Sequence, residues 1–204
     1  MARILGHQMR TFALTMERRA RVWIDSSEMP GVMSVDERRM LKYRDVYCRG
    51  NQKARRTAIA VELFIPVGGR FLYGMLGGKA FGSEASQSLI EIADMTSHGR
   101  VVVDSLAGSL DTVVPWVDAE YYDSILDGAS AAVEGFEAFP DKFVFCSGRQ
   151  GALGSTPILF RRLAHICVAL LAAPDADIEK RLEERGGPVC LDRDLKPISG
   201  ALRM

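Results

Sequence analysis

The stretch KFVFCSGRQGALGSTPILFRRL, residues 142–163, joins a strand pattern, a glycine-rich loop and a helix pattern. Aromatic and β-branched residues fill 142–147, which predicts a buried strand. Pro157 is typical of the first turn of a helix, and an apolar helical pattern then runs to just before Pro174. A strand that leads through a loop into a helix is the building unit of α/β proteins.

Further strand and helix patterns alternate along the rest of the chain. Apolar or β-branched runs predict strands over 58–65, 101–106 and 188–191. Helical patterns cover 84–95, 118–136 and 175–185. This order predicts an α/β fold, with a small, mostly parallel sheet flanked by helices. Because the strand over 58–65 also fits a helix, the alternative is a mainly helical fold with a two-stranded pair.

The first 56 residues are predicted to form a basic helical arm. Ser34 and Glu37 form a capping-box pattern ahead of a second amphipathic helix. The chain is therefore divided into an arm over 1–56 and an α/β body over 57–204. The first helix is indicated by apolar residues that share one stripe, namely Leu5, Met9, Phe12, Met16 and Trp23.

The formal net charge of zero conceals a strong asymmetry. Residues 1–56 carry 13 Lys and Arg against 6 Asp and Glu, a net +7, whereas residues 84–141 carry 12 acids against Arg100 alone, a net −11. A basic arm favours an acidic protein surface, further copies of the chain, or a nucleic acid backbone as the partner. The candidate partner-binding residues are Arg10, Arg18, Arg19, Arg21, Arg38, Arg39, Lys53, Arg55 and Arg56.

The glycine-rich loop is a candidate anion site. Glycines three residues apart allow backbone N–H groups to converge, and the following helix adds the positive end of its dipole. Aligned at Gly148, however, the loop has Leu153 and Gly154 where a nucleotide-binding P-loop has glycine and lysine. The candidate anion-binding residues are Ser147, Gly148, Arg149, Gly151, Gly154, Ser155 and Thr156.

Cys146 raises the alternative of a reactive thiolate at the mouth of this loop. A helix N-terminus beside a thiol lowers its pKa. Strand alternation instead places Cys146 on the same face as Val144, and both faces of a central strand are covered, so we expect a buried, slowly reacting thiol. The scattered Cys and His residues fit neither a disulfide framework nor a metal site, which favours a reducing intracellular compartment.

The sequence contains no complete catalytic motif, no cofactor-binding motif and no apolar run long enough to span a membrane. Asp104, Ser105 and Asp111 follow the valine run and could form a carboxylate site, but no histidine is placed beside them by sequence. We therefore expect a non-catalytic structural or interaction subunit of a larger intracellular assembly, anchored through its basic N-terminal helices. The alternative is a phosphate- or nucleotide-binding α/β enzyme or sensor that uses loop 148–156.

Overall fold

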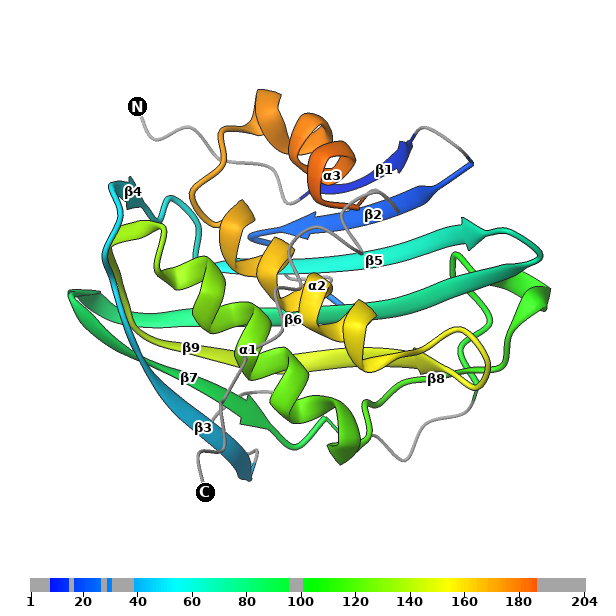
Figure 1. Cartoon of the computed structure of the whole chain (residues 1–204), viewed down its shortest axis with the longest axis horizontal. Helices are drawn as coiled ribbons and strands as arrows, with labels where there is room; N and C mark the ends of the chain where they lie inside the picture. The colour runs from blue at the N-terminus through cyan, green and yellow to red at the C-terminus, as the bar shows by residue number, and fades with distance from the viewer. Residues whose placement is uncertain (1–7, 15–16, 27–28, 31–38, 96–100, 187–204) are drawn as a thin grey trace, which may run out of the picture.

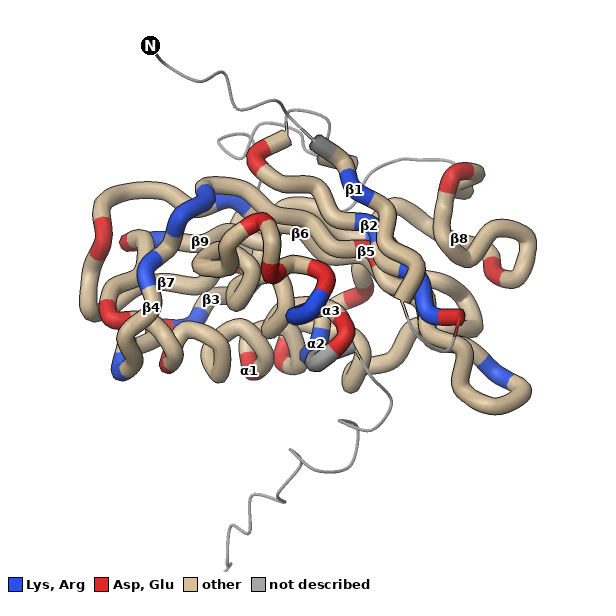
Figure 2. The backbone as a smooth tube through the Cα atoms, turned by 90° about the horizontal axis from the view of Figure 1, so that it is seen from above, with Lys and Arg blue, Asp and Glu red and all other residues tan. Residues whose placement is uncertain are grey.

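The computed structural model describes residues 8–14, 17–26, 29–30, 39–95 and 101–186. In these residues nine strands form one sheet with helices along one face (Figures 1 and 2). Seven strands follow the order β1-β2-β5-β6-β9-β7-β3, and β4 and β8 pair with β9. The strands are β1 (Gln8–Ala13), β2 (Arg19–Ile24), β3 (Met40–Tyr47), β4 (Gln52–Lys53), β5 (Ala58–Val67), β6 (Arg70–Ala85), β7 (Gln87–Ala93), β8 (Val113–Val114) and β9 (Phe136–Gly151).

The sheet is mixed and mostly antiparallel. β7 and β4 run parallel to β9, and the other pairings are antiparallel. The expected small, mostly parallel sheet is therefore wrong, and so is the mainly helical alternative. The physical reason is that consecutive strands are joined by short turns, as in the β5–β6 hairpin at Gly68 and Gly69, and a short turn reverses the chain direction.

Three helices form a layer on one side of the sheet, which we call the helix face. They are α1 (Tyr122–Val133), α2 (Pro157–Leu170) and α3 (Ile178–Gly186). α1 and α2 pack against each other and over the centre of the sheet, while α3 lies near β1 and β2 (Figure 1). The expected start of α2 at Pro157 is confirmed, and the side chain of Thr156 caps it by accepting a hydrogen bond from the N–H of Leu159 at 3.2 Å.

The central strand β5 is buried on both faces. Its odd-numbered residues from Ile59 to Ile65 pack under the helices in the main core. Its even-numbered residues point to the other side, which we call the opposite face, and Phe64 packs there with Tyr73 and Leu106. Double burial explains why residues 58–65 read as a continuous apolar run rather than an alternating one.

Two predicted elements have a different secondary structure, and both differences change the composition of the sheet. The expected strand over 101–106 is a loop that covers part of the opposite face, and Val103 in it is 93% exposed. The expected helix over 84–95 is instead the end of β6 followed by β7, in which Ile90 and Ile92 both point toward the helices. The expected strand over 188–191 lies outside the described residues.

The described part of the expected helical arm consists of strands. In β2, Ala20 and Val22 enter the core while Arg19 and Arg21 point to the opposite face, so the residues alternate with the period of a strand. β2 pairs with β5, and β3 pairs with β7. The division of the chain at residue 56 has not been tested by independent folding and stays a prediction, but strands from both sides of it are hydrogen-bonded in the same sheet.

None of the helices in the described ranges is long and apolar enough to span a membrane.

Candidate functional site

The glycine-rich loop forms a tight turn whose N–H groups already hold a carboxylate. β9 extends to Gly151, and the N–H groups of Leu153 and Gly154 donate to the two carboxylate oxygens of Asp111 at 3.0 and 2.8 Å. A side chain at Gly151 would collide with that carboxylate, because its Cβ would lie 2.0 Å from Asp111 Oδ2. In the structure, these N–H groups therefore hold an acid of the chain itself.

The other polar groups of this turn also have internal partners. The hydroxyl of Ser155 accepts from the N–H of Gly151 and donates to the carbonyl of Tyr73, both at 2.8 Å. Thr156 caps α2. An external phosphate at this turn would have to displace Asp111, so anion binding here stays a prediction with a specific competitor.

The residues before the turn are spread over both faces of β9. Ser147 donates to the carbonyl of Pro30, and Gly148 lies against Val117 and Met95. Cys146 is completely buried next to Ala93 and Val144, which confirms the expected burial of its thiol. These side chains do not converge on one point with Arg149.

Arg149 belongs to a buried charged cluster on the opposite face. Glu62 is fully buried and accepts hydrogen bonds from the phenol of Tyr73 at 2.8 Å and from the N–H of Leu106 at 3.0 Å. Arg21 lies 3.3 Å from Glu62, and Arg149 lies 3.9 Å from it. Burial, followed by the charge of Glu62, raises the pKa of Tyr73 well above its usual range, so the phenol stays protonated and keeps donating.

The sequence did not indicate this cluster, because Arg21, Glu62, Tyr73 and Arg149 come from four strands. Asp104, which was considered with Ser105 and Asp111 as a carboxylate site, pairs with Arg21 at 3.3 Å instead. Neighbouring cross-strand positions on one face bring the four together. The cluster satisfies charges beneath the loop that contains Leu106, and we assign it a structural role.

Most described cations among residues 1–56 pair with acids from elsewhere in the chain. Near the helix layer, Arg10 pairs with Asp175 at 3.1 Å and Arg18 pairs with Glu183 at 2.8 Å. Arg56 is buried and donates to the carbonyls of Leu170 and Ala173 and to Asp175. The remaining pairs are Lys42–Asp123 at 2.5 Å, Arg44–Asp127 at 2.5 Å and Lys53–Glu137 at 3.8 Å.

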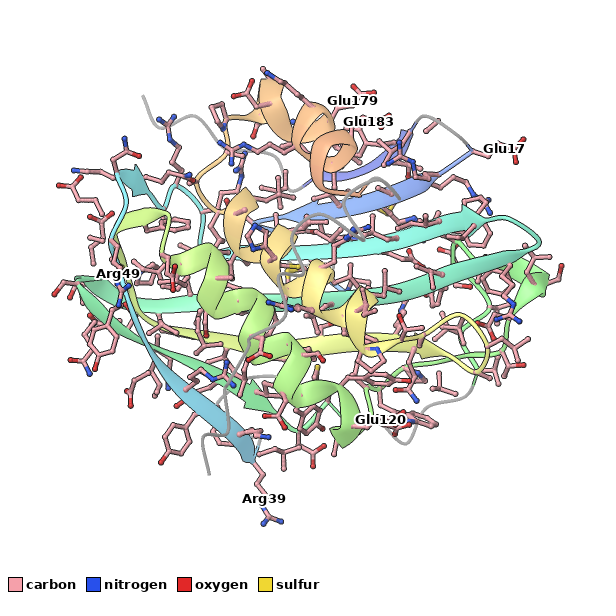
Figure 3. The ribbon with its side chains drawn as sticks, viewed as in Figure 1. Glu17, Arg39, Arg49, Glu120, Glu179 and Glu183 are labelled. Atoms are coloured by element: carbon pink, nitrogen blue, oxygen red, sulfur yellow. The ribbon has the colours of Figure 1, made fainter. Side chains whose placement is uncertain are left out.

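Most described cations of residues 1–56 are thus paired within the molecule, partly with acids of residues 84–141 and partly with Asp175 and Glu183 of the C-terminal segment. Of the candidate partner-binding residues, Arg19, Arg39 and Arg55 are exposed and form no ion pair within the described part of the chain. Arg39 points away from the body beside the start of β3 (Figure 3). Arg38 lies outside the described residues.

An exposed row on β3 was missed by the sequence reasoning. Leu41, Tyr43 and Tyr47 are 39%, 68% and 54% exposed. They point to the opposite face, because Lys42 and Arg44 between them reach α1 on the helix face. The signal was the short alternation of apolar and charged side chains over residues 41–44, which the expected helix obscured. Together with Asp45, these three residues form what we call the β3 row.

Other features of the described residues do not define a reaction. No group of three or more His, Cys, Asp or Glu side chains in the described ranges is arranged to hold a metal ion. No family model matches the chain, and comparison with curated proteins and with solved structures also gives no match. The functional argument therefore rests on the surface and contacts of this chain alone.

Proposed function

We propose that the protein is a non-catalytic interaction subunit of a larger intracellular assembly, in which copies of the chain join through the edge strand β3. The observation that carries the proposal is the β3 row on the last strand of the sheet. Among the described residues, β3 pairs on one side only, with β7. Large side chains on an edge strand are normally covered or replaced by charges, because an open edge can pair with another chain.

The side chains of the β3 row suit pairing with a second copy. In an antiparallel pair that sets Arg44 of one copy opposite Arg44 of the other, Leu41 faces Tyr47 and Tyr43 faces Asp45. Aromatic–aliphatic cross-strand pairs each contribute roughly 0.2–1 kcal/mol, and a two-fold axis makes each pair occur twice. The β3 row is therefore complementary to itself.

The helix side of the same edge does not oppose such pairing. Lys42 and Arg44 would bring like charges together across a seam between two copies. Each is paired with a carboxylate of α1, at 2.5 Å in both cases. The expected repulsion is therefore reduced, since each cation is already neutralised within its own subunit.

Binding of a phosphate or nucleotide at the glycine-rich turn is the alternative proposal. Binding of nucleic acid by the exposed cations is a further one. For the turn, an external anion must compete with Asp111, whose two oxygens are held by two N–H groups. An intramolecular carboxylate has a high effective concentration, so a free anion binds only if its own contacts exceed those of Asp111. For this reason we favour association through the β3 edge over anion binding at the turn.

The proposal is tested by measuring the molar mass of the full chain by light scattering between about 1 µM and 1 mM, the range of a moderate interface. We expect the mass to rise toward that of a dimer. The variant Tyr43→Asp/Tyr47→Asp changes four side chains in the dimer. We therefore expect the dissociation constant of the dimer to rise on the order of 100-fold.

Val103→Asp is the matched control, because Val103 is 93% exposed and lies on the loop of the opposite face rather than on β3. It should behave like the unaltered chain. A chain that stays monomeric at the highest concentration would refute self-association. A dimer that survives the double tyrosine change would refute β3 as the joining strand.

A further inference from the structure

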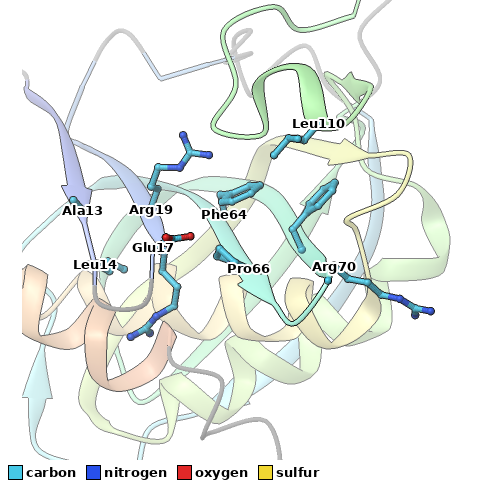
Figure 4. A pocket seen from close by; sticks show the side chains of 11 residues that line it. Ala13, Leu14, Glu17, Arg19, Phe64, Pro66, Arg70 and Leu110 are labelled. Atoms are coloured by element: carbon cyan, nitrogen blue, oxygen red, sulfur yellow. The ribbon is translucent and has the colours of Figure 1, made fainter.

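A separate pocket lies at the other end of the sheet, where two hairpins end at different distances. β2 begins at Arg19, opposite Phe64, whereas β5 continues to Val67 before the chain turns into β6. The β5–β6 hairpin therefore extends past β2 and leaves an open depression of about 640 Å³ beside it (Figure 4). Pro66 lines this depression and, lacking an N–H group, cannot donate a hydrogen bond to an added strand.

The floor of the pocket is aromatic and apolar. The rings of Phe64 and Phe71 are stacked, with centroids 5.5 Å apart and planes 20° apart. Leu110, which is 56% exposed, lies across from them (Figure 4). Phe64 is almost fully buried beneath Arg19, so the part of this floor that is open to a flat ring is Phe71 beside Leu110.

The guanidinium group of Arg19 gives the rim a positive charge. It lies 4.5 Å from the centroid of the Phe64 ring, which holds it at the pocket. Arg70 also lines the pocket, but its side chain points away from Arg19 (Figure 4). Neither forms an ion pair with a described carboxylate, including Glu17, which also lines the pocket.

Most other cations of the described residues lack this combination of a free charge and an apolar floor. Arg21, Arg44 and Arg56 are each bound to an internal carboxylate, and the N–H groups of the glycine-rich turn hold Asp111. Arg19, by contrast, borders an apolar floor and forms no ion pair with a described carboxylate, although Glu17 lines the same pocket. Guanidinium groups recognise carboxylate and phosphate groups with paired hydrogen bonds.

We propose that this pocket binds a small aromatic anion, with a flat ring against Phe71 and Leu110 and a carboxylate or phosphate directed to Arg19. An aryl carboxylic acid and a purine nucleotide share this chemistry. The pocket is at the β2–β5 end of the sheet, away from β3, so the proposal does not depend on self-association.

The test is a titration of the full, isotope-labelled chain followed by backbone amide NMR. The probes are 2-naphthoate with its uncharged analogue 2-naphthalenemethanol, and adenosine monophosphate with adenosine; inorganic phosphate alone is the fifth probe. We expect at least one charged probe to shift the amides of Arg19, Phe64, Phe71 and Leu110. Its uncharged analogue should bind about tenfold more weakly or worse, since a hydrogen bond to a charged group is lost.

Variants separate the pocket from the rest of the surface. Arg19→Gln should weaken the charged probe about tenfold, and Phe71→Leu should weaken charged and uncharged probes alike. Arg55→Gln, at an exposed arginine outside the pocket, should change nothing. The spectra report at the same time whether each variant is folded.

The two possible sources give different results. Binding of naphthoate alone identifies an aryl acid, and binding of the nucleotide alone identifies a nucleotide; both support the pocket. Failure of both charged probes to bind at millimolar concentration overturns the proposal. Equal binding of charged and uncharged probes also overturns it, as do shifts confined to Leu153 and Gly154, which would assign the anion to the glycine-rich turn.

Discussion

The two edge strands of the sheet, β1 and β3, present different side chains on the face away from the helices. On β1 these are Met9, Thr11 and Ala13, whereas on β3 they are Leu41, Tyr43, Asp45 and Tyr47. Tyrosine and leucine form stabilising cross-strand pairs, while alanine offers little surface. Both strands have unpaired backbone within the described residues, so the proposal that copies join through β3 depends on its side chains.

The helix sides of the two edges are both neutralised by ion pairs, but to different extents. Next to β1 and β2, Arg18 and Arg56 are almost fully buried in their contacts with the C-terminal helical segments. Next to β3, Lys42 and Arg44 pair with α1 in partly exposed positions. We therefore assign the first group to stability of the fold and the second to the charge balance of an exposed edge.

The largest effect on stability is expected from Arg56→Met. This change removes the buried guanidinium that donates to the carbonyls of Leu170 and Ala173, and it removes one of the two arginine partners of Asp175. We expect the free energy of unfolding, measured by urea denaturation, to fall by about 2–4 kcal/mol. Arg55→Met is the control, because Arg55 is exposed, and it should stay within about 0.5 kcal/mol. Equal losses in the two variants would contradict the buried role of Arg56.

A second effect is expected at the β3 edge from Asp123→Asn/Asp127→Asn. Both substitutions keep the side-chain shape but remove the charges that neutralise Lys42 and Arg44. Dimer formation should weaken about tenfold at low salt, since like charges then meet across the seam. The loss should shrink as salt is added, because exposed charges are screened. Glu137→Gln, which affects only the long 3.8 Å contact with Lys53, is the control.

A smaller, local effect is expected in the alkylation rates of the cysteines, one of which lies next to the β3 edge. Cys48 immediately follows β3 and is half-buried, whereas Cys146 and Cys167 are fully buried. Burial raises the pKa of the Cys48 thiol above its ordinary value of 9.0, so little thiolate is present at pH 7. Iodoacetamide should therefore label Cys48 slowly at pH 7 and faster above pH 9, with Cys146 and Cys167 protected until the protein unfolds. Peptide mass spectrometry measures each site, and rapid labelling of Cys146 at neutral pH would contradict its burial.

The smallest effect concerns pH. A hydrogen bond from Arg56 holds the pKa of Asp175 below its ordinary value of 3.8. A pKa that is lowered by folding stabilises the folded state at pH values above the unfolded pKa, and this stability is lost as the pH falls through the folded-state pKa. The unfolding free energy should therefore decrease below about pH 4, and less steeply in Asp175→Asn. Urea denaturation at pH 6 and pH 3 checks this. If the difference in unfolding free energy between the two pH values is the same in the variant, Asp175 does not cause it.

The sequence predicted those elements whose signals are local. The start of α2 follows from Pro157, and the strand over 142–147 follows from its aromatic and β-branched residues, which lie within β9. The burial of Cys146 follows from strand alternation. In each case a few neighbouring residues carry the whole signal.

The sheet topology could not be predicted, because pairing depends on residues far apart in the sequence. The stripe that includes Met9 and Phe12 fits a helix, yet β1 forms because β2 pairs with it and with β5. The valine run at 101–103 has strand propensity, but its backbone is used in a loop where the N–H of Val102 donates to the carbonyl of Val113 at 2.8 Å. Tertiary pairing thus overrides propensity in both places.

The candidate site was predicted only in its chemistry. The affinity of the glycine-rich turn for an anion agrees with the two N–H groups on Asp111, but nothing in the local pattern shows that an acid about forty residues earlier fills the turn. The charge asymmetry was likewise visible in the sequence, whereas the ion pairs that join its two segments, such as Arg44–Asp127, required the fold. The β3 row became visible only when β3 was known to be an edge strand.

The most direct test of the central claim is hydrogen exchange of the backbone amides of β1 and β3 at low and high protein concentration. Both are edge strands, so both have amides without a strand partner in the part of the chain that the structure describes. If copies join through β3, the outward-facing amides of β3 should become protected as concentration rises, while those of β1 should exchange at the same rate throughout. The Tyr43→Asp/Tyr47→Asp variant should show no such change. Exchange in β3 that does not depend on concentration, or protection that rises equally at both edges, would contradict the account.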